Sequence, residues 1–180
     1  MPPKERTRAP LPRCLRAPRV DRDVAMAVSE MATELTTEST FEALVQLTHR
    51  FFWCLDEFRY DELQGLMRED AVWHRQGKVL TGRAQIRAAL EERPRSQRIR
   101  HVVTNPFIAE QSAGTARMIA YMIGYRADEG VSRPAPQTID GPLRFLVVET
   151  RFVHTDGRWW IADQRALPEF EFRNALPPAR

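Results

Sequence analysis

The order of hydrophobic and polar positions divides the 180-residue chain into a helical first half and a strand-rich second half. From residue 41 to residue 58, apolar side chains recur every three or four positions, the spacing that places them on one side of a helix. Ser39 followed by Glu42 has the form of a capping box, which predicts that this helix begins just behind Ser39. Shorter helical patterns near residues 61–67 and 83–92 predict two further helices.

From Arg98 onward the hydrophobic period changes from helical to alternating. The alternation predicts four strands, near residues 99–110, 116–126, 143–154 and 158–167, and a shorter strand precedes them at residues 71–74. Gln76-Gly77 and Asp156-Gly157 have the composition of tight turns, and the second pair predicts a hairpin. Residues 127–142, with three prolines and two glycines, predict a long loop of the kind that borders binding cavities.

Helices followed by a run of long strands are typical of an α+β fold. We expect about three N-terminal helices packed in a strongly curved mixed or antiparallel sheet, a cone-shaped roll whose open end is a pocket.

Charge is concentrated at the N-terminus. The net charge is +3, but residues 1–22 hold seven basic side chains against two acidic ones, so the remainder has no basic footprint for nucleic acid. Prolines between these arginines prevent a packed element, and we therefore expect residues 1–35 to be a disordered tail, 36–172 the folded domain and 173–180 a flexible C-terminus. A true start at Met26 or Met31 stays open.

Composition also limits the cellular compartment and the kinds of cofactor chemistry that we expect. Cys14 and Cys54 make no plausible disulfide framework, and we see neither a signal peptide nor an apolar run long enough to span a membrane, so we expect a cytoplasmic protein. There is no glycine-rich phosphate loop and no Cys/His spacing typical of zinc sites. The sequence thus predicts no metal and no cofactor.

His101 is the strongest candidate for chemistry. Two-residue alternation places Ile99, His101, Val103 and Asn105 on one face of a strand, where an imidazole needs a partner. Asp56, at the end of the amphipathic helix, is the best candidate for that partner. A histidine oriented by a carboxylate is suited to abstracting a proton near neutral pH. The competing interpretation is a satisfied core histidine and an unrelated helix-end aspartate.

Five short segments, in this order, resemble the SnoaL-like branch of the nuclear transport factor 2-like superfamily over residues 39 to 170. They are residues 51–56, 70–73, 80–83, 100–105 and 156–161. The resemblance implies a cone of three helices and a bent sheet, dimerisation through the sheet, and chemistry without a cofactor.

Within that superfamily the pattern is similar to scytalone dehydratase, the bacterial bile-acid dehydratase and the hexachlorocyclohexane dehydrochlorinase. The dehydrochlorinase motif His-x-x-Thr-Asn matches His101, Thr104 and Asn105. By this similarity His101 is the general base and Asp56 its orienting partner. Asn105 is also a candidate donor to a developing oxyanion.

Further substrate contacts are expected from the same resemblance. Phe51 stands where the bile-acid dehydratase has a tyrosine, so a hydroxyl is expected from Tyr121 or Tyr125 instead. Arg165 on the last strand is expected to hold a carboxylate or oxyanion. The other expected lining residues are Phe51, Phe52 and Trp73; His74 and Glu149 are weaker candidates.

These observations leave two functions open. The first is a lyase or isomerase, dehydratase-like or cyclase-like, that acts on a small apolar ring-containing metabolite without a cofactor. The second is a non-catalytic small-molecule binder or accessory subunit, like the small subunit of ring-hydroxylating dioxygenases. The pairing of Asp56 with His101 favours the enzyme. For either function we expect a homodimer with no nucleic-acid or membrane partner.

Overall fold

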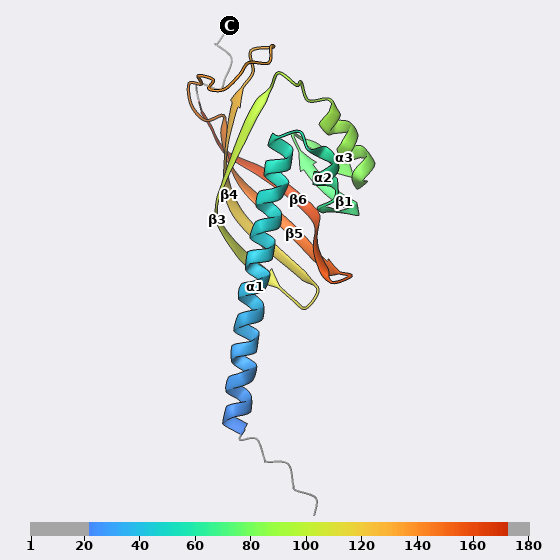
Figure 1. The fold of residues 1–180 in the computed structure, drawn as a ribbon, viewed down its shortest axis with the longest axis vertical. Helices are drawn as coiled ribbons and strands as arrows, with labels where there is room; N and C mark the ends of the chain where they lie inside the picture. The colour runs from blue at the N-terminus through green and yellow to red at the C-terminus, as the bar shows by residue number, and fades with distance from the viewer. Residues whose placement is uncertain (1–21, 173–180) are drawn as a thin grey trace, which may run out of the picture. The chain divides into compact units, whose positions relative to one another are not determined.

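The computed structural model describes residues 22–172, which form three helices and six strands (Figure 1). The chain divides into two compact units between Thr36 and Thr37, and the second unit contains the sheet and the site described below. The expected flexible C-terminus, residues 173–180, and residues 1–21 of the expected tail lie outside the described residues.

Helix α1 runs from Arg22 to Asp56, so the prediction that it begins behind Ser39 is wrong. Residues 22–35, expected to be disordered, are helical as well. Residues 23–38 contain no proline or glycine and are rich in good helix formers such as alanine, glutamate and methionine, so nothing stops the helix at the capping box. Neither α1 nor any other helix within residues 22–172 is long and apolar enough to cross a membrane.

The strands build one six-stranded sheet in the order β2-β1-β6-β5-β4-β3. The four long strands pair antiparallel with one another, whereas β1 runs parallel to β6, which confirms the expected mixed α+β sheet. The two short helices α2 and α3 lie beside β1 (Figure 1). The bounds are α2 Tyr60–Gln64, β1 Met67–Arg75, β2 Lys78–Thr81, α3 Gly82–Glu91, β3 Arg98–Gln111, β4 Thr115–Ala127, β5 Arg144–Thr155 and β6 Arg158–Glu171.

Both predicted turns are confirmed. The β1–β2 turn has φ values of 52° at Gln76 and 77° at Gly77, and the β5–β6 turn has 53° at Asp156 and 73° at Gly157. Two successive residues with positive φ are the mark of the tight hairpin turn whose twist matches that of the strands.

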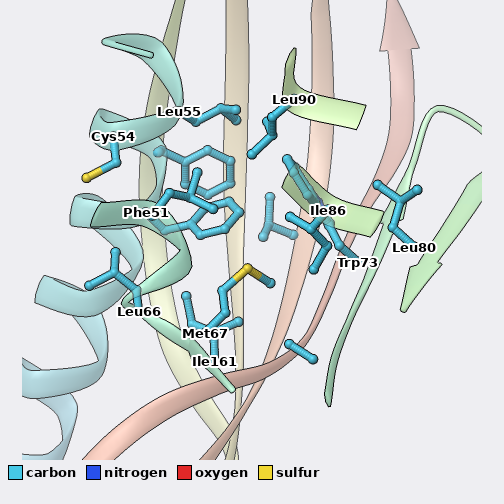
Figure 2. Packing of buried hydrophobic residues seen from close by; sticks show 14 of the residues in the cluster. Phe51, Cys54, Leu55, Leu66, Met67, Trp73, Leu80, Ile86, Leu90 and Ile161 are labelled. Atoms are coloured by element: carbon cyan, nitrogen blue, oxygen red, sulfur yellow. The ribbon is translucent and has the colours of Figure 1, made fainter. Parts of the chain in front are cut away.

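One apolar side of α1 packs on the sheet and forms the core (Figure 2). Phe51 is completely buried, and its ring meets Phe52 and Trp73 edge-to-face, at 5.3 Å between centroids in both pairs. Thr48, also on this side, satisfies its hydroxyl by donating to the Leu44 carbonyl at 2.9 Å. The sequence stripe therefore predicts the buried side of the helix correctly from Leu44 to Leu55, whereas Phe41 at its start is 36% exposed.

Four bulges interrupt β3 and β6, and two of them change which expected site residues face the helix. In β3, Thr104 pairs with Tyr121 and Phe107 with Ile119, so two residues, Asn105 and Pro106, lie opposite one. In β6, Ile161 pairs with Phe152 but Asp163 pairs with Arg151, so Ala162 is an extra residue. An extra residue shifts a two-residue period by one, and every side chain beyond it changes face.

Replacing Phe51 with alanine tests whether this helix is anchored mainly by its aromatic contacts. The Phe51→Ala variant should lose about 3–5 kcal/mol of unfolding free energy, because a fully buried ring leaves a cavity behind it. Urea denaturation followed by far-UV circular dichroism measures the change. Val79→Ala, at a position 59% exposed on β2, serves as control and should differ from the parent by less than about 0.5 kcal/mol. Equal losses in the two variants would contradict the packing described here.

Candidate active site

Asp56 and His101 are in direct contact, as the sequence predicts. Asp56 Oδ1 lies 2.6 Å from His101 Nδ1, and Asp56 Oδ2 accepts the backbone N–H of His101 at 2.8 Å. Both carboxylate oxygens are therefore held by one residue of β3. The Asp56 side chain is 6% exposed and the His101 side chain 14%, so water competes little for these bonds.

The position of Asp56 depends on how α1 ends. The Arg59 N–H donates to the Cys54 carbonyl at 2.8 Å, and Phe58 adopts a left-handed φ of 57°, the geometry of a Schellman cap. Nη1 of Arg93 donates to the Leu55 carbonyl at 2.5 Å and satisfies a second helix-end acceptor. The carboxylate is thus fixed at the last helical residue and faces β3.

The His101 ring is positioned by its neighbours as well as by Asp56. Its cross-strand partner is Gly124, where an added Cβ would lie 4.0 Å from the ring carbon Cδ2. The Phe52 ring lies on another side, 5.1 Å away between centroids. Because Asp56 engages Nδ1, Nε2 is the nitrogen left to meet a ligand.

His101 lines a cavity of about 210 Å³ between α1 and the sheet. Its walls are mostly apolar, with a polar group at a few points. The apolar lining includes two residues expected from the sequence, Phe52 and Trp73, and adds Leu55, Ile99, Met122, Leu143, Leu146, Ala166 and Pro168.

Arg165, Asn105 and Tyr121 do not line this cavity, contrary to expectation. The extra residue Ala162 turns Arg165 to the opposite face of the sheet, where its Nε binds Asp163 at 3.1 Å. The bulge in β3 leaves Asn105 exposed, with a φ of 51°, and its Oδ1 accepts the Thr104 hydroxyl at 2.9 Å.

The other expected polar contacts also lie on the opposite face. Tyr121 and Tyr125 alternate with the buried Met122 and Gly124 along β4, and the Tyr121 ring packs against Phe145 at 5.3 Å. Glu149 on β5 lies 3.7 Å from Arg117.

Two more expected residues can be placed. His74 borders the cavity rim, and its Nε2 lies 3.8 Å from Asp163. Phe51 packs behind Phe52 and Trp73 and has no surface in the cavity.

Sequence reasoning missed Gln164 and Arg93, which contribute polar groups to the lining. Gln164 is 1% exposed, and its Oε1 has no hydrogen-bond partner among the described residues. Arg93 is 7% exposed and has two unpartnered nitrogens, Nε and Nη2. A strand alternation corrected for the Ala162 bulge would have found Gln164, whereas no local pattern marks Arg93.

Burial shifts the pKa of two groups in this region. Burial lowers the pKa of the Arg75 guanidinium at the cavity rim, and the positive charge of Arg93 lowers it further. Burial raises the pKa of the Cys54 thiol, with a smaller contribution from the Glu62 charge, so Cys54 acts as a neutral packing residue. Within residues 22–172, no three His, Cys, Asp or Glu side chains gather as a metal site would require.

Residues 39–165 match the family model of the SnoaL-like domain. Among curated proteins no match is found.

Solved structures share the fold at low sequence identity. A putative scytalone dehydratase from Novosphingobium aromaticivorans has a TM-score of 0.60 and 21% identity over 81% of this chain and 97% of its own. The β subunit of a putative aromatic-ring-hydroxylating dioxygenase from the same organism has a TM-score of 0.61 and 12% identity, over 78% and 96%. ActVI-ORFA from Streptomyces coelicolor has a TM-score of 0.60 and 15% identity, over 72% and 98%.

Neutralising Asp56 tests the contact between the two residues. In Asp56→Asn an amide NH₂ replaces one oxygen and meets an N–H of His101, so a charge-assisted bond is lost. We expect the low-field proton NMR signal of the His101 Nδ1–H to disappear and the unfolding free energy to fall by about 1.5–3 kcal/mol. Glu57→Gln is the control: this neighbouring carboxylate is half-exposed and pairs with Arg100, so its loss should cost less than about 1 kcal/mol and leave the signal in place. A signal that survives in Asp56→Asn would refute the assignment.

Proposed function

Because this chain belongs to the SnoaL-like domain family, we propose that it is a cofactor-independent lyase or isomerase that removes a proton from carbon in the cavity beside His101. The observation that carries the proposal is the pair of hydrogen bonds between Asp56 and His101, one at Nδ1 and one at the backbone N–H. This pair of bonds leaves Nε2 of a neutral imidazole as the base.

The proposed reaction needs only groups of this chain. His101 Nε2 takes a proton from a carbon next to a carbonyl, and the C–H electron pair moves into a new C=C bond as the carbonyl oxygen gains negative charge. Asp56 stabilises the imidazolium that forms. Return of the proton to another carbon gives an isomer, whereas loss of hydroxide from the β-carbon, protonated by the imidazolium, gives a dehydrated product and water.

The lining supports a small ring-containing substrate. An apolar cavity of about 150 Å³ holds a benzene ring, so about 210 Å³ admits a slightly larger molecule. Gln164 lines the cavity, its Oε1 is buried without a hydrogen-bond partner among the described side chains, and we expect it to accept a hydroxyl or amide N–H of that molecule. Mostly apolar walls with a few polar groups are typical of sites that bind small molecules.

Proton exchange in D₂O tests the activity without knowing the natural substrate. Cyclic ketones and β-hydroxy ketones, each with and without a carboxylate, are incubated with the protein, and the loss of α-proton NMR signals is followed. At least one should exchange or eliminate about 10²–10⁴-fold faster with the wild type than with His101→Gln. His154→Gln, an exposed histidine on β5, is the matched control and should retain the wild-type rate. Failure of every compound to react faster than in buffer would count against the enzyme.

An accessory subunit is the second candidate function, favoured by the fold shared with the dioxygenase β subunit and by an apolar sheet face. The sheet face opposite α1 carries large exposed apolar side chains, namely Val102, Phe107, Tyr121, Leu167 and Phe170. Exposed apolar surface of this kind marks an interface. The proposed enzyme is a cytoplasmic homodimer that uses this face, whereas a subunit would need a different chain to cover it.

Oligomeric state separates these two functions. We expect the purified chain to elute as a homodimer in size-exclusion chromatography with light scattering, and Phe107→Glu to shift it toward monomer by at least about tenfold in dissociation constant, because a buried charge is costly. Val79→Glu, exposed on β2, is the control and should remain dimeric. A chain that is monomeric or aggregated when purified alone would favour the subunit.

A further inference from the structure

Arg93 carries polar groups that the proton abstraction does not use. The residue lies just beyond the end of α3, is 7% exposed and lines the cavity. Its Nη1 donates to the Leu55 carbonyl at 2.5 Å, and its Cζ lies 4.5 Å from the centre of the Phe58 ring. Nε and Nη2 have no hydrogen-bond partner within the described part of the chain. The cap on α1 therefore accounts for one nitrogen of three.

The two unpartnered nitrogens are the two that form one edge of the guanidinium. Their N–H groups point the same way, as a fork that fits the two oxygens of a carboxylate. A buried charged donor without a partner is costly in free energy. A ligand that supplies both acceptors removes this cost, which favours its binding. We propose that Arg93 binds a carboxylate of the substrate through this edge, so that the cavity selects ring-containing acids.

The charges around the cavity support an anionic ligand. Its lining holds three arginines and no aspartate or glutamate. Arg144 is paired with Glu171 at 3.0 Å, but neither Arg75 nor Arg93 forms an ion pair with any side chain that the structure describes. The two unpaired guanidiniums lie close enough for the charge of Arg93 to lower the pKa of Arg75, and a bound carboxylate relieves this repulsion.

This inference rests on the proposed function in one respect, because it assumes that the substrate occupies the cavity beside His101. Arg93 and His101 line the same cavity, so an acid bound at Arg93 would share the cavity with the base. Arg93 is thereby a binding residue that determines specificity.

Binding of two probes of equal shape tests the selection. Benzoate and benzamide are titrated separately into the wild type, and the indole N–H signal of Trp73, which lines the cavity, is followed by NMR. We expect benzoate to bind about tenfold more tightly than benzamide, because bonds to a charged acceptor are stronger than those to a neutral one. In Arg93→Gln the ratio should fall to about one, and in Arg93→Lys, which keeps the charge but not the fork, it should be intermediate.

Arg87→Gln is the matched control, since this arginine lies on α3, does not line the cavity and is paired with Asp61 and Glu91; its ratio should stay near that of the wild type. If Arg93→Gln does not fold because the cap on α1 is lost, the ratio of benzoate to benzamide affinity in the wild type and in Arg93→Lys still tests the inference. A wild-type ratio of one, or a preference for benzoate that persists in folded Arg93→Gln, would overturn the inference.

The same data separate this inference from the proposed function. If the preference for benzoate is lost in Arg93→Gln but the wild type exchanges no α-proton, the acid-binding site is supported and the proposed enzymatic function is contradicted. If the wild type exchanges the α-protons of neutral ketones but does not prefer benzoate, the enzymatic function is supported and the acid-binding site is contradicted.

Discussion

The structure depends on a buried carboxylate, Asp56, whose two oxygens are both taken by His101. A carboxylate at a helix C-terminus is disfavoured by the helix dipole by about 0.3–1 kcal/mol, and its burial adds a larger cost. Two bonds from N–H donors, each contributing about 1.5–3 kcal/mol to a charged acceptor, are what make the position tenable. The same bonds tie α1 to β3, so fold and chemistry share one contact.

The last backbone carbonyls of α1 also need hydrogen-bond donors, and several groups near the helix end supply them. A residue other than glycine with a left-handed φ, here Phe58, costs about 1–3 kcal/mol and is retained because the Schellman cap and the guanidinium of Arg93 satisfy the last carbonyls. Rings from both neighbouring sides, Phe52 and Phe58, exclude water from these bonds. A helix end without this support would fray, and the carboxylate would lose its fixed direction.

Much of this arrangement could be predicted from the sequence because it follows from short-range patterns. The helical period located the buried side of α1, and the alternation located four long strands and singled out His101. The resemblance to the SnoaL-like branch implied the pairing of His101 with Asp56. The start of α1 could not be predicted, since a capping box limits a helix only where the preceding residues resist it. Arg93 could not be predicted either, because its role comes from a contact with Leu55, 38 positions earlier in the chain, which no local pattern marks.

The polar lining of the cavity was the least predictable part, and the reason is a single residue. Counted from Ile161 without interruption, strand alternation directs Arg165 toward the helix; with Ala162 as an extra residue it directs Gln164 there instead. The sheet thus contributes a neutral amide where a guanidinium was expected, and the arginine joins Asp163 on the other face. The positive charges that line the cavity come instead from Arg75 at the end of β1, Arg144 at the start of β5 and Arg93 just beyond α3. One inserted residue in β6 therefore decides whether this strand contributes a guanidinium or a neutral amide to the cavity.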